Sequence, residues 1–282
     1  DIYYVLDRGV IIRNEKGKAI RMIGAMTNIS DQKDYEIQLK QLNQELQKHA
    51  IELKRSNEEL EQFAFITSHD LQEPLRMITS FMDQLKRKYG EDLDDKALQY
   101  IHFASDGAKR MKQIILDLLD YSRADKPSEE KEKVNLDQLV SYYKQSRRKL
   151  IAESSASIIS KELPEIKTYR AAITQIFNCL LDNAIKYSKA DDSPIVEISF
   201  IEKAKEWEFA IKDNGIGIDP QFYNKVFVMF QRLHNRETYE GTGIGLSIVK
   251  RSVEFLGGEI WLTSTIGEGS VFHFTISKLE KI

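Results

Sequence analysis

His69 and Asp70 are neighbours in the stretch "FITSHDLQEPLRMITSF" at residues 65–81. An imidazole with a carboxylate beside it keeps one tautomer and can attack through its other nitrogen, so the pair could act as a nitrogen nucleophile and its base. Pro74 lacks the backbone donor that would reach the carbonyl of Asp70, and we therefore predict a bend there. Taken alone, an exposed His–Asp pair near a bend needs no function.

Flexible turns at the ends of regular elements could hold a ligand. "DNGIGID" at 213–219 places Asp213 where a strand ends, before Gly215 and Gly217. Without side chains at these two positions, the backbone can come close to a flat ligand. Such a turn could bind a flat ligand beside Asp213, although glycine turns that join strands to helices are common.

A second glycine-rich stretch, "EGTGIGLSIVK" at 240–250, directly precedes an apolar helix. Its backbone amides and the helix N-terminus suit phosphate binding, although it lacks the Lys-Ser/Thr ending of a Walker sequence. On the helical stretch "NCLLDNAIKYS" at 178–188, Asn183 and Lys186 are three residues apart and share a face. One offers an oxygen to Mg²⁺ and the other a cation to phosphate, but a solvated helix face explains this pair equally well.

The composition excludes several classes of protein. The chain has 282 residues, 41% hydrophobic and 30% charged, with a net charge of -3, so nothing favours binding to nucleic acid. One cysteine excludes an internal disulfide, and no apolar run approaches the length of a membrane span. We expect a cytoplasmic protein without nucleic-acid partners and without a membrane segment in this chain. Because the chain opens on two strands joined by a turn, we also expect it to be a fragment.

A heptad repeat follows these strands. Its apolar seam predicts a coiled coil over residues 31–62 and a parallel homodimer. His49 and Ser56 interrupt the seam, either as imperfect core filling or as places where the helix register can change. The seam positions are Leu39, Leu42, Leu46, His49, Leu53, Ser56, Leu60 and Phe63.

The rest of the chain predicts an all-α part and an α+β part. Two long apolar-periodic helices over residues 63–125 form a hairpin, and two hairpins in a dimer would make a four-helix bundle. A charged linker at 126–133 leads to residues 134–282, where helices and strands alternate and predict an α+β sandwich with helices on one face of a largely antiparallel sheet. We expect helices near 136–151, 170–187 and 244–256, strands near 157–161, 195–202 and 207–212, and a C-terminal hairpin.

Together these stretches resemble the histidine protein kinases of two-component signalling. "FAFITSHDLQEPLR" resembles the phosphoacceptor box, "NCLLDNAIKYS" the N box, "DNGIGID" the G1 box, "FVMFQRLH" the F box and "GTGIGLSIVK" the G2 box. The order and spacing match over about residues 60–278. Residues 1–30, ending in "GAMTNIS", resemble the C-terminal strands of a PAS sensor domain. The resemblance implies a dimeric histidine-phosphotransfer hairpin followed by a Bergerat-type ATP-binding domain.

The resemblance also implies roles for individual residues. His69 would accept the γ-phosphoryl group of ATP, Asp70 would be its base, and an aspartate on a response-regulator receiver domain would receive the group next. Asn183 would bind Mg²⁺ and Asp213 the adenine amino group. The implied nucleotide-binding residues are Asn183, Lys186, Tyr187, Asp213, Gly215, Gly217, Phe230, Arg232, Gly241, Thr242, Gly243, Gly245 and Leu246, and Phe227 would help dock the lid.

Two positions depart from the family pattern. Cys179 stands where the N box usually carries a first asparagine, so metal binding rests on Asn183 with water, and Asp182 is a further candidate ligand. Glu73 stands where many relatives have a Thr or Asn that positions a hydrolytic water, so we expect weak phosphatase activity. Two alternatives stay open: another ATPase of the same fold, such as a chaperone or topoisomerase, which needs no phosphoacceptor, and a pseudokinase that serves as a dimeric scaffold.

Overall fold

The computed structural model describes residues 3–124, 130–233, 239 and 241–279. The chain divides into two compact units, residues 1–63 and 64–282. Within the described residues, no helix is both long and apolar enough to cross a lipid bilayer.

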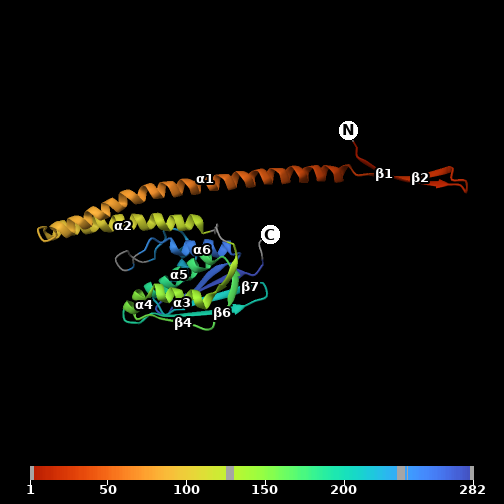
Figure 1. Cartoon of the computed structure of the whole chain (residues 1–282). Coiled ribbons are helices and arrows are strands. Elements are labelled where there is room, and N and C mark those ends of the chain that lie inside the picture. The colour runs from red at the N-terminus through yellow and green to blue at the C-terminus, as the bar shows by residue number, and fades with distance from the viewer. Residues whose placement is uncertain (1–2, 125–129, 234–238, 240, 280–282) are drawn as a thin grey trace. The chain divides into compact units, whose positions relative to one another are not determined.

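The first unit contains a two-stranded hairpin and the first half of a long helix (Figure 1). Strands β1 (Val5–Arg13) and β2 (Ala19–Asn28) pair antiparallel, as the sequence predicts. Asn14 closes the turn between them, because its side-chain oxygen accepts the backbone N–H groups of Lys16 and Lys18. Every described side chain of both strands is exposed. The PAS assignment of residues 1–30 stays a prediction.

Helix α1 (Ser30–Tyr89) begins in the first unit and carries the heptad repeat. Leu39, Leu42, Leu46 and Leu53 are all more than half exposed in the single chain. An apolar stripe of this length is stable in water when a second helix covers it. The side chains of the last two seam positions, Leu60 and Phe63, lie outside the described part.

The second unit begins with a helical hairpin made of the rest of α1 and α2 (Asp95–Arg123). The side chain of Asp94 caps α2 by accepting the N–H of Ala97 at 2.7 Å. Leu75 of α1 and Ala108 of α2 are buried in this hairpin. The predicted helical hairpin is therefore confirmed for the single chain.

The α/β part is built on a five-stranded sheet of order β4-β6-β7-β9-β8. Only the pair β4·β6 is parallel, so the sheet is largely antiparallel, as predicted. The strands are β4 (Ser157–Ser160), β6 (Ile195–Glu202), β7 (Glu206–Asp213), β8 (Ile260–Thr265) and β9 (Gly269–Ser277).

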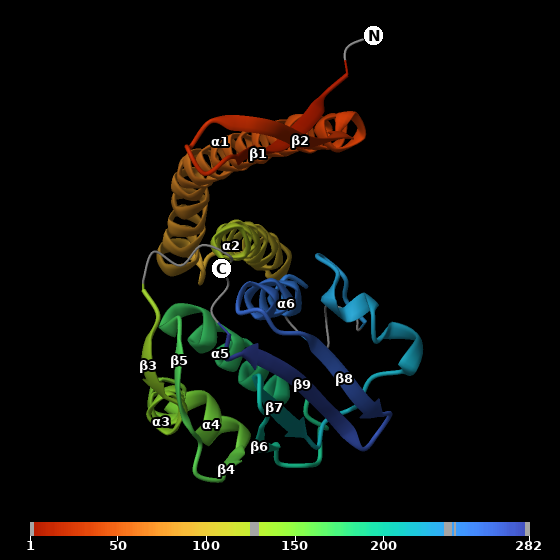
Figure 2. The same ribbon diagram turned by 90° about the vertical axis from the view of Figure 1, so that its right-hand side faces the viewer.

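Helices cover one face of this sheet (Figure 2). They are α3 (Leu136–Ser146), α4 (Arg148–Ser154), α5 (Arg170–Lys186) and α6 (Gly245–Phe255), with two short 3₁₀ turns, η1 (Pro220–Phe222) and η2 (Lys225–Phe227). At the centre, Phe177 of α5 meets the rings of Phe209 and Phe274 edge-on, and all three are fully buried. This aromatic cluster holds α5, and hence its polar face, against the sheet.

Two local features differ from the sequence prediction. One helix was expected near 136–151, but the chain leaves helical geometry at Arg147 (φ -100°, ψ 16°) and forms α3 and α4 instead. A second sheet pairs β3 (Glu132–Asn135) with β5 (Glu165–Thr168), and β3 starts inside the segment assigned to the linker. Strands of four residues are too short to show a period.

Candidate nucleotide and phosphoacceptor sites

A cavity of about 760 Å³ lies between α5, α6 and the end of β7. It brings together stretches that are far apart in the sequence. Among the predicted nucleotide-binding residues, those that line it are Asn183, Lys186, Tyr187, Asp213, Gly217, Arg232, Gly241, Thr242, Gly243, Gly245 and Leu246. Gly215 lies directly behind Asp213, whereas Phe230 is more than half exposed and does not line the cavity.

Asp213 ends β7 and is 8% exposed. Its Oδ1 accepts the backbone N–H groups of Gly215 at 2.8 Å and Ser270 at 3.1 Å. Burial raises the pKa of Asp213, and the two backbone hydrogen bonds oppose this shift. Because both bonds reach Oδ1, the other carboxylate oxygen remains available to a hydrogen-bond donor in the cavity.

The turn after Asp213 requires glycine at two positions. A Cβ on Gly215 would lie 2.4 Å from the carbonyl oxygen of Tyr187. Gly217 has φ +72°, and a Cβ there would lie 2.1 Å from the carbonyl oxygen of Thr265. The glycines therefore let β7, α5 and β8 approach closely at the cavity.

Lys186 and Tyr187 form the wall opposite the glycine-rich loop. The Lys186 Nζ donates to the Tyr187 hydroxyl at 3.1 Å, and it lies 2.7 Å from where a Cβ on Gly241 would be. The ring of Tyr187 packs on Tyr239 at 5.0 Å. A cation is thus held next to the loop, where a phosphate would meet both.

His69 and Asp70 lie on the exposed side of α1, with side-chain exposures of 77% and 74%. The His69 Nδ1 is 3.5 Å from Asp70 Oδ1, which leaves Nε2 facing outward. The helix continues through Pro74 to Tyr89. Among the described residues, neither His69 nor Asp70 lines the cavity.

Two family models match the chain. The His Kinase A (phospho-acceptor) domain matches residues 59–127, which include the His–Asp pair. The family of histidine kinase-, DNA gyrase B- and HSP90-like ATPases matches residues 168–280, which include most of the residues that line the cavity. The chain belongs to the histidine kinases. It combines the phospho-acceptor and ATP-binding domains of a sensor histidine kinase of two-component signalling.

Curated relatives agree with this assignment. The kinase is 40% identical over 215 residues to the phytochrome-like protein Cph1 of Synechocystis sp., covering 76% of this chain and 29% of that protein. It is 37% identical to cyanobacterial phytochrome B of Nostoc sp., and the match covers 93% of this chain and 34% of that protein. Sensor protein kinase WalK of Staphylococcus aureus is 28% identical, and the match covers 76% of this chain and 53% of that protein. The chain therefore spans about a third of the length of the phytochrome relatives.

Solved structures show the same fold. Full-length ShkA in complex with AMPPNP superimposes with a TM-score of 0.59 at 20% identity, covering 76% of this kinase and 45% of that chain. Histidine kinase ThkA in complex with response regulator protein TrrA gives a TM-score of 0.51 at 20% identity, and the match covers 97% of this chain and 75% of that chain.

Cys179 packs at the base of the kinase's cavity. A Cβ on Gly245 would lie 2.9 Å from its Sγ, and Asn183 Nδ2 lies 3.9 Å from the same atom. Burial, followed by the nearby charges of Asp182 and Asp117, raises the pKa of Cys179 to about 12. The thiol is therefore neutral at pH 7. Because Mg²⁺ prefers oxygen ligands, Cys179 is a poor ligand for this ion.

The donor set fits an ion that is held mainly by a nucleotide. Within the described residues, no group of three or more His, Cys, Asp or Glu side chains could enclose a metal. Asp182 does not supply a free oxygen either, because it is bonded to Tyr143 and Arg147. Asn183 therefore stays as the side-chain candidate, which suits Mg²⁺ bound through phosphates and water.

Sequence reasoning missed two residues of α2 that also line the cavity, Asp117 and Asp120. The Asp117 Oδ2 accepts the Thr242 hydroxyl, and burial together with Asp117 raises the pKa of Asp120. Because Asp117 and Asp120 are three residues apart, the sequence shows only that they share a face of the helix. Nothing in the sequence indicates that this face meets the glycine-rich loop.

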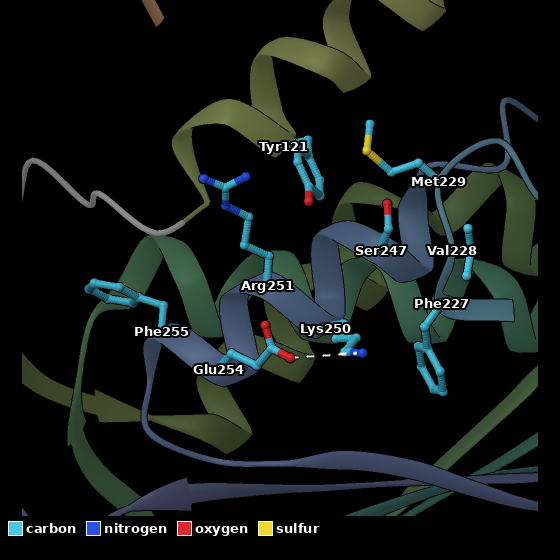
Figure 3. A pocket seen from close by; sticks show the side chains of 9 residues that line it. All are labelled: Tyr121, Phe227, Val228, Met229, Ser247, Lys250, Arg251, Glu254 and Phe255. Carbon is cyan, nitrogen blue, oxygen red and sulfur yellow. Dashed lines mark ion pairs between the residues drawn. The ribbon is translucent and has the colours of Figure 1, made fainter. Parts of the chain in front are cut away.

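The same helix contacts α6 through apolar groups. Ala124 is buried against Ile244 and Ile248, and Arg251 of α6 lies over the ring of Tyr121, 4.6 Å from its centroid. Figure 3 shows Tyr121 and Arg251 at a second cavity of about 730 Å³, which is also lined by the ion pair of Lys250 and Glu254. In this conformation α2 therefore covers the start of α6.

Removing the Asp117 carboxylate is expected to tighten nucleotide binding. Asp117→Ala frees the Thr242 hydroxyl and removes a negative charge from the cavity that receives phosphates, so we expect the Kd for ADP to fall about two- to fivefold, which corresponds to about 0.4–1 kcal/mol for a partly exposed charge. Titration with a fluorescent nucleotide measures it. Asp106→Ala, on an exposed turn of the same helix, is the matched control. Unchanged or weaker binding in Asp117→Ala would contradict this expectation.

Proposed function

We propose that this kinase phosphorylates its own His69 with ATP and passes the phosphoryl group to an aspartate of a response-regulator receiver domain. The observation that carries the proposal is the cavity, which gathers the N-box, G1-box and G2-box residues in one place. The exposed His69–Asp70 pair supplies the nucleophile in the phospho-acceptor domain. The chain's partial coverage of its relatives leaves their sensor regions outside this proposal.

Each wall of the cavity has a role in positioning ATP. The second carboxylate oxygen of Asp213 would accept a hydrogen bond from the adenine amino group. Lys186 and the backbone amides of the loop from Gly241 to Gly245 would hold the phosphates. Tyr187 would pack beside the nucleotide, and Arg232 and Phe230 would belong to the lid. Asn183 would hold Mg²⁺. When bound, Mg²⁺ neutralises charge on the phosphates.

The chemical step uses few protein groups. The lone pair of His69 Nε2 forms a bond to the γ-phosphorus as the bond to the ADP oxygen breaks. Asp70 holds the proton on Nδ1, which keeps Nε2 unprotonated, and accepts that proton as the ring becomes cationic. Attack by Nε2 agrees with the geometry, because Nδ1 is the nitrogen that faces Asp70. A carboxylate oxygen of the receiver aspartate then forms a bond to the phosphorus as the N–P bond breaks, which regenerates His69.

A homodimer is part of the proposal. The exposed leucine stripe of α1 and the match to the phospho-acceptor domain support it. Two hairpins would bury these stripes as a coiled coil and a four-helix bundle. We therefore expect light scattering to give twice the mass of one chain.

Purified protein with Mg²⁺ and γ-labelled ATP tests the function. We expect acid-labile, base-stable label on the protein, followed by transfer to a receiver domain. Nucleotide binding without any label, in the dimer and at saturating ATP, would instead favour a scaffold role.

Glu73 gives a prediction about the reverse reaction. Its side chain is exposed, with Arg76 at 3.9 Å, so a substitution leaves the fold intact. Glu73→Thr is expected to raise the rate of dephosphorylation of a phosphorylated receiver domain, because a neutral hydroxyl can orient water without repelling the phosphoryl group. Glu73→Val has the same shape without the hydroxyl and is the control. Equal rates in the two variants would rule out a role for the hydroxyl.

A further inference from the structure

Asp182 lines the nucleotide cavity one residue before the proposed Mg²⁺ ligand Asn183. Its Oδ1 accepts the Tyr143 hydroxyl at 2.8 Å and Arg147 Nε at 3.1 Å, and its Oδ2 accepts Arg147 Nη2 at 3.0 Å. Arg147 thus forks across both carboxylate oxygens, the strongest geometry for this type of ion pair. Asp182 is therefore a charged group in the nucleotide cavity whose charge is already balanced.

We propose that Arg147 is a positioning residue for the nucleotide: it neutralises Asp182 and holds this carboxylate away from the metal and the phosphates. The inference rests on the proposed function, because it assigns a role within the same ATP site. It concerns binding of the nucleotide, and the transfer of the phosphoryl group to His69 is a separate question.

The N box of this kinase needs such a residue. Cys179 lies 3.9 Å from Asn183 Nδ2 and offers sulfur, whereas Mg²⁺ prefers oxygen ligands, so Asn183 has little help in binding the metal. A free carboxylate on Asp182 would become the strongest oxygen donor nearby. In the absence of metal, this carboxylate would repel the phosphates. In the presence of Mg²⁺, it would compete with the phosphates for the ion. With Arg147 in place, neither effect operates.

The two donors to Asp182 are fixed by the fold. Tyr143 is 1% exposed, and its pKa is raised by burial and then by the charge of Asp182, so its hydroxyl stays protonated and donates. Arg147 sits at the break between α3 and α4, where its own N–H still bonds to the carbonyl of Tyr143 at 2.9 Å. Arg147 therefore keeps the i, i+4 spacing that places it on the same helix face as Tyr143, and both side chains reach Asp182.

Arg147 also lines the cavity and is about half exposed, so a direct contact between its guanidinium and a phosphate is the competing explanation. The two explanations differ in what happens when Asp182 loses its charge. If Arg147 serves to neutralise Asp182, the arginine becomes dispensable once the carboxylate is gone. If it binds phosphate, it stays necessary.

The experiment measures ADP affinity, with Mg²⁺ and with EDTA, for the wild type, Arg147→Met, Asp182→Asn and the double variant. We expect Arg147→Met to weaken metal-free binding about tenfold and binding with Mg²⁺ less, since Mg²⁺ offsets the exposed carboxylate. The double variant should return to within about twofold of the wild type. A double variant that binds as weakly as Arg147→Met would overturn the proposal.

Controls separate positioning from folding. Thermal unfolding of each variant tests whether the domain folds, and Arg148→Met, one residue further along and also exposed, should bind ADP like the wild type. Tyr143→Phe should shift the ratio of metal-free to Mg²⁺-dependent affinity in the same direction as Arg147→Met, but less. A wild type that binds ADP without phosphorylating His69 would contradict the proposed function alone, whereas one without ADP affinity would contradict both.

Discussion

Substituting His69 with glutamine is expected to remove all labelling by γ-labelled ATP, to below about one thousandth of the wild-type rate, while ADP affinity stays unchanged. Glutamine keeps the length and hydrogen bonding of the side chain but has no lone pair suited to attack phosphorus. Because His69 is exposed and lines no part of the cavity, neither the fold nor the nucleotide site should respond. The measurements are acid-labile label and a nucleotide titration on the same preparation.

His49→Gln is a closely matched control for this result. His49 lies on the same helix, is similarly exposed and also has a carboxylate nearby, with its Nδ1 3.4 Å from Glu52 Oε2. It lies outside the phospho-acceptor match, so labelling should persist. Label that survives His69→Gln would assign the phosphoacceptor to another residue.

Asp213→Asn is expected to lower ADP affinity about 100-fold, or about 3 kcal/mol, without unfolding the domain. The amide oxygen can still accept the N–H groups of Gly215 and Ser270, which keeps the turn in place. The amide nitrogen then replaces the free carboxylate oxygen and presents a donor to the adenine amino group, which is itself a donor. Two donors facing each other in a buried site leave both unsatisfied.

The matched control is Asp219→Asn. Asp219 ends the same glycine-rich stretch, and its Oδ1 accepts the N–H of Gln221 at 3.0 Å in an exposed turn. It should bind ADP like the wild type. ADP affinity that stays within about threefold in Asp213→Asn would contradict the adenine role, because an unsatisfied buried pair costs more than that.

Sequence patterns predicted the helices and strands that have a periodic apolar face, and the glycine-rich turns that end them. The periods of α5 and α6 and the alternation of β6 and β7 locate these elements to within about two residues, because each has one buried face. The glycine turns located the cavity for the same kind of reason, since only glycine permits the close approaches seen at Gly215 and Gly217. The individual roles of these residues stay predictions.

Contacts between distant segments could not be predicted in this way. The Arg147–Asp182 ion pair joins residues 35 apart in the sequence, and the Asp117–Thr242 hydrogen bond joins residues 125 apart. Neither leaves a local period or a composition change. The exposed state of Phe230, which has φ +61°, also depends on the conformation of the loop and not on its sequence pattern.

The passage of α1 through Pro74 gives the helix an uneven local stability. Proline has no N–H, so the carbonyl of Asp70 lacks its helical donor at the residue next to His69. Amide hydrogens in the turns around this position should therefore exchange with solvent through small local openings, while the turns on either side stay protected. His69, the proposed phosphoacceptor, therefore lies where the helix can change its local geometry without unfolding as a whole, and a small change there would reorient its imidazole.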